Sequence, residues 1–319
     1  MPTYIGIDIA KASFEADING VIRQFKNNAA GAKALMKATA ADSMYIIEAT
    51  GNYSVALAEA LFADDRRVKI VNPLSAKRFA QLKLKRTKTD PIDAHLLSQY
   101  GEIAAEPEFE PTSDDANAAK QDQSVLEGLK KIKTALENQL EALRQLPRPS
   151  PEAIKALRDE IKHVKQTMDK LSSKIRTRCQ AAYPGMIERL ETIPGIGPVI
   201  SSTLVVATDG FARFDDPKQV VAYVGACPTQ YQSGTSVRGH GPISRSCNPT
   251  VRTKCYMGAL SAKRGKNEFR EFYSRKRAEG KPHKVAMMGV INKLLRIAFA
   301  VAKQGIEYQP GHARQAQTA

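Results

Sequence analysis

The sequence predicts three parts: an α/β domain built on a mixed sheet, an antiparallel pair of long helices, and a mainly α-helical C-terminal domain. Strand-like and helix-like segments alternate over the first hundred residues. Apolar residues then recur every three or four positions on both sides of a proline-rich break. With 319 residues the chain is too long for one small core, which favours two or three domains.

The first domain is expected to cover residues 1–103. Its predicted strands are residues 4–9, 14–18, 21–26, 44–48 and 68–71, and its predicted helices are residues 30–40 and 55–63. Asn19-Gly20 is a hairpin signal between the second and third strands. Three antiparallel strands followed by crossovers make a mixed sheet, as in ribonuclease-H-like domains, where acidic residues gather at strand ends.

Four carboxylates in this domain are candidate metal ligands. Asp8 alternates with the isoleucines of its strand, Glu48 ends an apolar run, and Asp90 and Asp93 are three apart on one helix face. Oxygen ligands select hard cations such as Mg²⁺ or Mn²⁺, which can assist phosphodiester cleavage. Three of these acids also have a specific structural alternative: Asp8 as a solvent-facing strand residue, Glu48 as a strand-end acid, and Asp90, before Pro91, as a helix N-cap.

The motif Gly6-Ile7-Asp8 also opens sugar kinases and actin-like ATPases. Those proteins need further glycine-rich phosphate loops and Asp-x-Gly repeats, which the sequence lacks. It also lacks GxxxxGK[ST], so nothing indicates nucleotide hydrolysis.

Residues 104–116 contain two prolines and several acids and are predicted to be a linker. An antiparallel coiled-coil hairpin is expected in residues 117–181, because prolines at 147, 149 and 151 interrupt two helical patterns. The second pattern is a heptad, with apolar residues at 154, 157, 161, 164, 168, 171 and 175. Such a hairpin spaces domains or joins protomers; a purely internal hairpin is the alternative.

The C-terminal domain is expected in residues 182–308, followed by a flexible tail, residues 309–319. Its segment Ile193-Pro194-Gly195-Ile196-Gly197-Pro198 resembles a helix-hairpin-helix, because Gly195 and Gly197 allow the backbone to turn. The helix that follows would offer free N–H groups to a phosphate. A tight turn that only packs helices would show the same glycines.

The net charge of +15 and the pI of about 9.6 favour a polyanionic partner. Residues 212–303 alone hold 18 Lys and Arg against 5 Asp and Glu, which favours phosphate contact over a solvated basic face. The absence of Trp argues against gripping single strands mainly by base stacking. The candidate contact residues are Lys83, Lys85, Arg86, Lys88, Lys263, Arg264, Lys266, Arg275, Lys276 and Arg277.

The four cysteines form no CxxC pair and are expected to be ordinary thiols rather than zinc ligands or a disulfide framework. The N-terminus lacks a signal-peptide pattern, and no apolar stretch is expected to span a bilayer. The expected location is therefore the cytoplasm, which in a bacterium includes the nucleoid.

A second chemical motif runs from Tyr231 to Gly239. Ser233, flanked by glycine in a basic domain, could attack phosphate, with Arg238 steadying the transition state. The run Ser233-Gly234-Thr235-Ser236 is also ordinary loop composition. Competing serines are Ser236, Ser244 and Ser246, and His240 could assist proton transfer or be structural.

Together these motifs resemble the insertion-sequence transposases with a DEDD catalytic set, which include pilin-gene invertases and bridge-RNA-guided recombinases. The resemblance covers almost the whole chain. Its elements, in order, are Tyr4-Ile5-Gly6-Ile7-Asp8, Glu48-Ala49-Thr50-Gly51, Lys88-Thr89-Asp90-Pro91-Ile92-Asp93-Ala94, Ile193-Pro194-Gly195-Ile196-Gly197, and Tyr231-Gln232-Ser233-Gly234 with Val237-Arg238-Gly239.

The resemblance implies that Asp8, Glu48, Asp90 and Asp93 form a RuvC-like Mg²⁺ site, with Mn²⁺ as a possible substitute. It also implies that Ser233 attacks DNA and becomes covalently joined to it. The implied partners are target and donor DNA, a noncoding guide RNA, and further copies of the chain in a dimer of dimers, whose protomers each supply half of a site. The alternatives are a RuvC-like nuclease or junction resolvase and a noncatalytic nucleic-acid-binding protein.

Overall fold

The computed structural model describes residues 3–49, 51–84, 90–233, 237–243 and 247–310. Within those ranges, the side chains of residues 90, 91, 229–233, 237, 238, 240 and 242 lie outside the description. The chain divides into two compact units, residues 1–111 and 112–319, each with its own apolar core.

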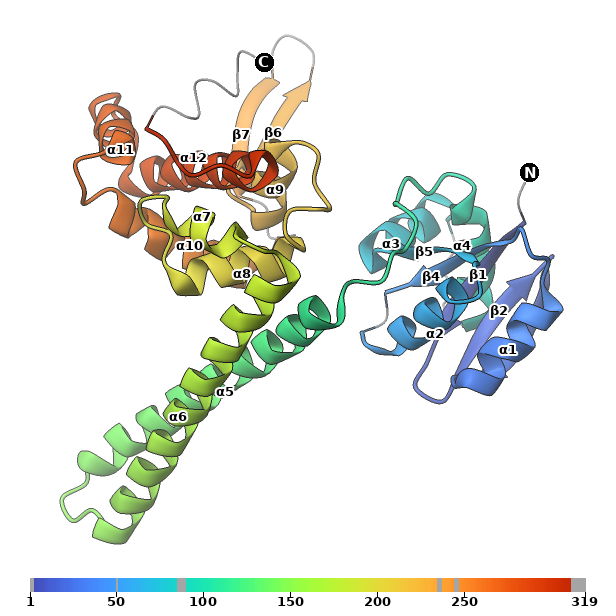
Figure 1. Ribbon diagram of the computed structural model, residues 1–319, viewed down its shortest axis with the longest axis horizontal. Helices are drawn as coiled ribbons and strands as arrows, with labels where there is room; N and C mark the ends of the chain where they lie inside the picture. Colours follow the sequence, from blue (N-terminus) through green and yellow to red (C-terminus); the bar gives the residue numbers. More distant parts are fainter. Residues whose placement is uncertain (1–2, 50, 85–89, 234–236, 244–246, 311–319) are drawn as a thin grey trace. The chain divides into compact units, whose positions relative to one another are not determined.

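The N-terminal unit is built on a five-stranded sheet in the order β3-β2-β1-β4-β5 (Figure 1). The strands are β1 (Tyr4–Ile9), β2 (Ser13–Ile18), β3 (Val21–Lys26), β4 (Met44–Glu48) and β5 (Arg67–Val71). β1, β2 and β3 pair antiparallel, whereas β4 and β5 run parallel to β1. Both residues of the predicted Asn19-Gly20 turn have positive φ, as a tight two-residue hairpin requires. The mixed sheet predicted from the sequence is confirmed.

Helices cover both faces of this sheet. α1 (Ala29–Ala38) and α2 (Tyr53–Phe62) bury the face that carries Ile5, Ile7 and Ile9. α3 (Pro73–Leu82) and α4 (Asp90–Gly101) cover the other face, where Ile46 packs against Leu97. The unit is thus a three-layer α/β sandwich (Figure 1).

The segment predicted as a linker belongs to the N-terminal unit as far as Phe109. The backbone N–H of Phe109 donates to the Val68 carbonyl at 2.7 Å, and its ring meets Phe62 edge-on. Beside it, Glu108 forms an isolated antiparallel β-bridge with Lys69, and its carboxylate forms an ion pair with Arg67. These contacts extend the β5 edge of the sheet.

Two long helices open the C-terminal unit, α5 (Asp114–Arg144) and α6 (Pro151–Ala182). Ser113 and Ser150 cap their N-termini, and the predicted break at the prolines is confirmed. The two helices pack antiparallel along their lengths (Figure 1). Ile161, Val164 and Ile175 of the heptad are buried, but Ile132 on α5 is 51% exposed. Supercoiling of this helical hairpin stays a prediction.

Among its described residues, the remainder of the unit is helical apart from one β-hairpin. Its elements are α7 (Met186–Glu191), α8 (Pro198–Thr208), α9 (Pro217–Val224), β6 (Pro228–Ser233), β7 (Val237–Ile243), α10 (Pro249–Ala262), α11 (Glu268–Ala278) and α12 (His283–Gln304). α12 is long and apolar enough to cross a membrane, contrary to the expectation that no such stretch exists. Half of its residues, however, lie buried in the unit's core, as expected of a core helix in a soluble protein.

Candidate carboxylate site and nucleic-acid surface

Asp8 and Glu48 lie near the carboxyl ends of two neighbouring parallel strands. The β1–β4 register pairs Ile7 with Ile47, so the next residue on each strand is one of these acids. Neighbouring strands are about 4.8 Å apart. Because side chains alternate along a strand, both acids point away from the buried isoleucine face, and both are partly exposed.

Helix α4 lies directly against β1, and Gly6 makes this close approach possible. The Gly6 N–H donates to Ser98 Oγ at 2.7 Å, and a Cβ added at Gly6 would lie 2.1 Å from the Ala94 carbonyl oxygen. Gly101, at the other end of α4, lies against Tyr4. The helix therefore runs antiparallel to β1, with its first turn toward the strand's carboxyl end.

This packing brings the start of α4, which carries Asp90 and Asp93, to the sheet edge where Asp8 and Glu48 lie. Asp93 is partly exposed, one residue before the contact with β1. α4 includes Asp90 as its first residue, one position later in the helix than the predicted N-cap. Over the described side chains, no three His, Cys, Asp or Glu gather closely enough to hold a metal ion. The Asp90 side chain lies outside the description, so the four-acid metal site stays a prediction.

A carboxylate that the sequence did not single out fixes α4 to the sheet. Asp17 on β2 is only 2% exposed, and its Oδ2 lies 2.7 Å from Nδ1 of His95 on α4. Its Oδ1 accepts from the Gly20 N–H at 2.8 Å. Gln99, one turn further along α4, lies 3.0 Å from the other ring nitrogen of His95. The alternation of apolar and polar residues along β2 was the only sequence signal for Asp17. This alternation did not identify His95 as its partner.

Ser233 ends β6 and pairs with Val237 of β7. The loop composition was noted only for residues 233–236, and just before them Tyr231 and Gln232 are strand residues paired with Gly239 and Arg238. The side chains of Ser233, Arg238 and His240, and residues Ser236, Ser244 and Ser246 entirely, lie outside the description. The serine nucleophile therefore stays a prediction.

The glycine turn between α7 and α8 has two different glycines. Gly195 has a φ of +91°, and a Cβ there would lie 2.3 Å from the Gly258 carbonyl oxygen of α10. The role of Gly195 is therefore to allow close packing of helices. This is the alternative to a phosphate-binding turn that the sequence left open. Gly197 caps α8, and a Cβ there would meet no atom within 4 Å. A phosphate contact at Gly197 stays a prediction.

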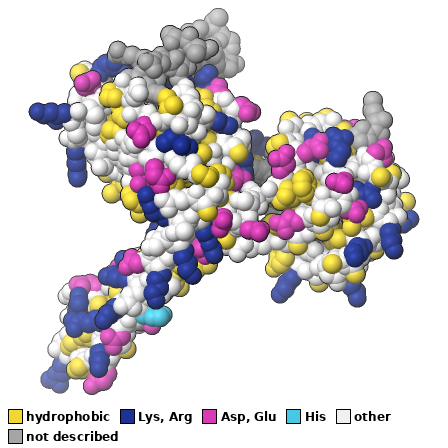
Figure 2. Space-filling view, in the orientation of Figure 1, with side chains coloured by type: hydrophobic (Ala, Val, Ile, Leu, Met, Phe, Trp, Pro, Cys, Tyr) yellow, Lys and Arg dark blue, Asp and Glu magenta, His cyan; other side chains and the backbone are white. Residues whose placement is uncertain are grey.

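The predicted basic contacts differ in their surroundings. Lys85, Arg86 and Lys88 lie outside the described residues, while Lys83 lies over the Phe79 ring. Lys263 lies 4.6 Å from the Tyr273 ring centroid, and Arg264, Lys266 and Arg277 are exposed. Figure 2 shows Lys and Arg side chains along the α5–α6 hairpin and around the rest of the C-terminal unit.

Two of the predicted residues, Arg275 and Lys276, line a large cavity together with four cations that the sequence did not single out. These four are Lys281, Lys293, Arg296 and Lys303. They were missed because they are isolated in the sequence rather than clustered. For Lys293, Arg296 and Lys303, their spacing on one face of α12 was the available signal, whereas Lys281 precedes that helix.

Comparison with known proteins shows similarity along the chain. Residues 187–274 match the family described as transposase IS116/IS110/IS902, and residues 5–145 match a transposase family named for the DEDD set of IS110. The pilin gene-inverting protein of Moraxella bovis is 32% identical over 95% of this chain and 96% of its own length. That of Moraxella lacunata is 33% identical over the same shares. A probable family 20 transposase of Pseudomonas aeruginosa is 31% identical over 52% of this chain and 49% of its own length.

Proposed function

The chain belongs to the IS110 family of transposases, DNA-cutting and DNA-rejoining enzymes, and on that premise we propose that it exchanges DNA strands through a covalent phosphoserine intermediate. Asp8, Glu48, Asp90 and Asp93 are the metal ligands in this proposal, and Ser233 is the nucleophile. The observation that carries it is the gathering of the ends of β1 and β4 and the start of α4 at one sheet edge.

The carboxylates fit a hard divalent cation, because they supply only oxygen donors. The family's DEDD domain implies dependence on a divalent ion in general, and Mg²⁺, with Mn²⁺ as a substitute, is our specific proposal. Such an ion would polarise the scissile phosphate and offset its developing charge. The protein's contribution is to hold the acids on a sheet and a helix that Gly6 and Asp17 keep together.

In the serine step, a phosphoserine bond replaces the phosphodiester bond that is broken in the DNA. The Ser233 oxygen bonds to phosphorus as the bond to one sugar oxygen breaks; the serine hydroxyl loses a proton and the leaving oxygen gains one. The reverse reaction with a different sugar hydroxyl rejoins the strand. No outside energy source is needed, since the phosphoserine bond replaces the phosphodiester bond.

The binding partners of the protein are also part of this proposal. The names of the Moraxella relatives describe inversion of a pilin gene, which is a DNA rearrangement. We propose target and donor DNA as substrates, a noncoding RNA as guide, a dimer of dimers as the active form, and the bacterial nucleoid as the site of action. The hydrolytic nuclease and the noncatalytic binder are not favoured by the family.

Denaturing gels test the nucleophile. The Ser233→Ala variant is expected to lose the covalent protein–DNA adduct, while Ser236→Ala, Ser244→Ala and Ser246→Ala, matched changes in the same region, keep it. An adduct that persists in Ser233→Ala would show that another residue attacks. Cleavage without any adduct would support the hydrolytic nuclease.

The acids are tested by strand cleavage on the same gels. Asp8→Asn and Asp93→Asn are expected to abolish cleavage, and EDTA should do the same until Mg²⁺ or Mn²⁺ is restored. Glu59→Gln is the matched control, because Glu59 is an exposed acid on α2. Full cleavage by both aspartate variants would exclude the proposed metal site.

A further inference from the structure

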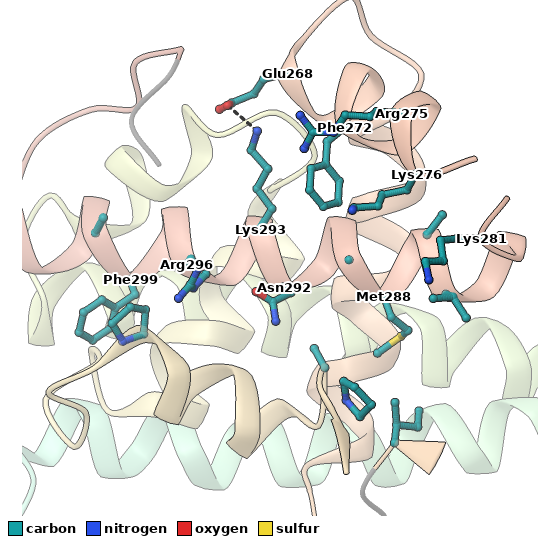
Figure 3. Close-up of a pocket in the computed structure, with 18 of the residues that line it drawn as sticks. Glu268, Phe272, Arg275, Lys276, Lys281, Met288, Asn292, Lys293, Arg296 and Phe299 are labelled. Carbon is teal, nitrogen blue, oxygen red and sulfur yellow. Dashed lines mark ion pairs between the residues drawn. The ribbon is translucent and has the colours of Figure 1, made fainter. Parts of the chain in front are cut away.

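The C-terminal unit has a groove between α11 and α12 that the proposed chemistry does not use. Its volume is about 980 Å³. Phe272, Met288 and Phe299 supply an apolar lining. Figure 3 shows Phe272 reaching from α11 toward the side chains of α12.

One face of α12 forms the length of this groove. Its lining residues recur every three or four positions, namely Val285, Met288, Asn292, Arg296, Phe299 and Lys303. At 1.5 Å per residue, this face extends about 27 Å. A second cavity shares Phe272, Arg275 and Lys293 with the groove and extends it to Lys266.

The groove is strongly positive. Among the described residues, six cations line it: Arg275, Lys276, Lys281, Lys293, Arg296 and Lys303. The described lining includes one carboxylate, Glu268, which pairs with Lys293 at 2.7 Å (Figure 3). Glu268 also accepts a hydrogen bond from the Tyr308 hydroxyl.

Not all of these cations are engaged by acids. Glu279, outside the groove, lies 2.8 Å from Lys276 and 3.9 Å from Arg275. Across the described part of the chain, no carboxylate lies within 4.0 Å of Lys281, Arg296 or Lys303. The charge therefore suits a polyanion.

Phe272 gives the groove an apolar surface bordered by positive charge. Its ring centroid lies 5.3 Å from Arg275, 5.8 Å from Lys276 and 5.7 Å from Lys293. A nucleobase can stack on such a ring while its phosphates meet the cations. Two aromatic rings, Phe272 and Phe299, among six cations agree with the low aromatic content of the chain, since the cations provide most of the contact.

The groove also borders the hairpin that carries Ser233. Pro228, Gly241 and Ile243, at the base of β6 and β7, are among its lining residues. Ser233 is five residues along β6 from Pro228, about 16 Å for an extended strand. A DNA strand leaving Ser233 along the hairpin would therefore reach the groove.

We infer that this groove holds unpaired nucleotides of the DNA strand that Ser233 cuts. The choice of that strand rests on the proposed function. A duplex keeps its bases stacked inside and would leave the apolar lining uncovered, whereas unpaired bases can cover Phe272 and Met288.

Fluorescence anisotropy with a short labelled single strand of DNA tests the inference, beside a duplex and an RNA of the same sequence. In the full chain, Phe272→Leu keeps an apolar side chain but removes the flat ring. It is expected to weaken single-strand binding on the order of 10-fold and to leave duplex binding unchanged. Replacing Arg296 and Lys303 together by Gln should reduce the salt dependence of single-strand binding by about 1.4 in the log–log slope. Lys33→Gln on α1, an exposed cation of the N-terminal unit, should do neither.

A photocrosslinking iodouracil in the single strand should label peptides of α11 and α12. Unchanged binding by Phe272→Leu, labelling confined to other peptides, or tighter binding of the RNA would each overturn the inference. Ser233→Ala separates this inference from the proposed function, because it should bind the single strand normally while forming no adduct. If the unaltered protein forms no adduct but the groove variants still lose binding, the proposed function fails and the groove assignment stands.

Discussion

At the scale of single residues, buried groups decide how the N-terminal acids are held. The Asp17 carboxylate accepts from Gly20 with one oxygen and meets His95 with the other, joining β2 to the helix that carries Asp90 and Asp93. It is almost fully buried, whereas the His95 side chain is 48% exposed. A buried donor or acceptor left without its partner is costly, so Asp17 is the sensitive member of this pair.

Replacing Asp17 by Ala should lower the free energy of unfolding by about 1–3 kcal/mol, because its hydrogen bonds with the Gly20 N–H and with His95 are both lost, at about 0.5–1.5 kcal/mol each. Urea denaturation measures this change. Asp42→Ala is the matched control at an exposed position of the same unit and should shift stability by less than about 0.5 kcal/mol. Equal effects of the two changes would show that the Asp17 contacts contribute little.

Cys255 is a second residue whose burial can be tested. It is fully buried on α10, and loss of solvation of the thiolate raises the pKa of this thiol to about 12 from an ordinary 9.0. The folded protein therefore keeps this proton at a pH where the unfolded chain loses it. Its stabilising contribution is complete below pH 9 and is lost as the pH rises toward 12.

Above pH 9 the free energy of unfolding should therefore fall with a slope of which Cys255 supplies about 1.4 kcal/mol per pH unit. The Cys255→Ala variant should be less stable at neutral pH but should show a shallower slope between pH 9 and 11. Urea unfolding at a series of pH values measures both slopes. Parallel slopes for the two proteins would contradict the assigned pKa.

Some of these residues were predictable and others were not. Asp8 and Glu48 follow from alternation and from apolar runs, which are local properties of a strand. The Asp17–His95 pair joins residues 78 positions apart, so it depends on how α4 lies on the sheet. The groove cations Lys293 and Arg296 share a helix face in the sequence, but the groove that they line forms only when α11 packs beside α12.

At the scale of elements, the contact between β1 and α4 leaves no room for a side chain at Gly6. At Gly6 the atoms that a Cβ would meet belong to the α4 backbone, at 2.1 Å for Ala94 O and 2.3 Å for Ser98 N. A backbone cannot rotate away as a flexible side chain can. Any side chain at this position must therefore move the whole helix.

Gly6→Ala should accordingly destabilise the N-terminal unit by about 1–3 kcal/mol and speed hydrogen exchange in α4. Strand cleavage should fall as well, since α4 carries two of the four acids. Gly128→Ala is the control: it lies within α5, a Cβ there meets nothing within 4 Å, and Ala should stabilise that helix by about 0.5–1 kcal/mol. Normal α4 protection in Gly6→Ala would contradict the close-packing role.

The elements also show where sequence patterns succeed. All five strands of the first unit and both helices of the hairpin were predicted, because each has a clear apolar period or a proline break. α3 and the β6–β7 hairpin were not. The hairpin is short, polar and glycine-rich, so its strands carry no alternating apolar signal.

At the scale of the whole molecule, charge is divided unequally between the units. Residues 1–111 contain 14 Lys and Arg and 14 Asp and Glu, whereas residues 112–319 contain 34 against 19. The entire excess of +15 therefore belongs to the C-terminal unit. Attraction of DNA from a distance should come from that unit, and the neutral N-terminal unit should act only at contact.

This division bears on how the two kinds of proposed catalytic residue cooperate. The acids belong to one unit and Ser233 to the other, and each unit has its own core. Nothing in the chain requires the acids and the serine of the same copy to act on the same phosphate. Our proposal, following the family resemblance, is that they come from different copies in the oligomer.

A mixture of two inactive variants tests this arrangement. Asp8→Asn chains keep the serine, and Ser233→Ala chains keep the acids, so a mixed dimer contains one intact site if each site draws on both copies. Random mixing should then restore roughly a quarter of the unaltered activity, since half of the dimers are mixed and each has one working site. Denaturing gels would reveal the restored adduct, and it should be attached only to Asp8→Asn chains, which a size tag identifies. No adduct in the mixture, although mixed dimers are captured through the tag, would show that each chain completes its own site.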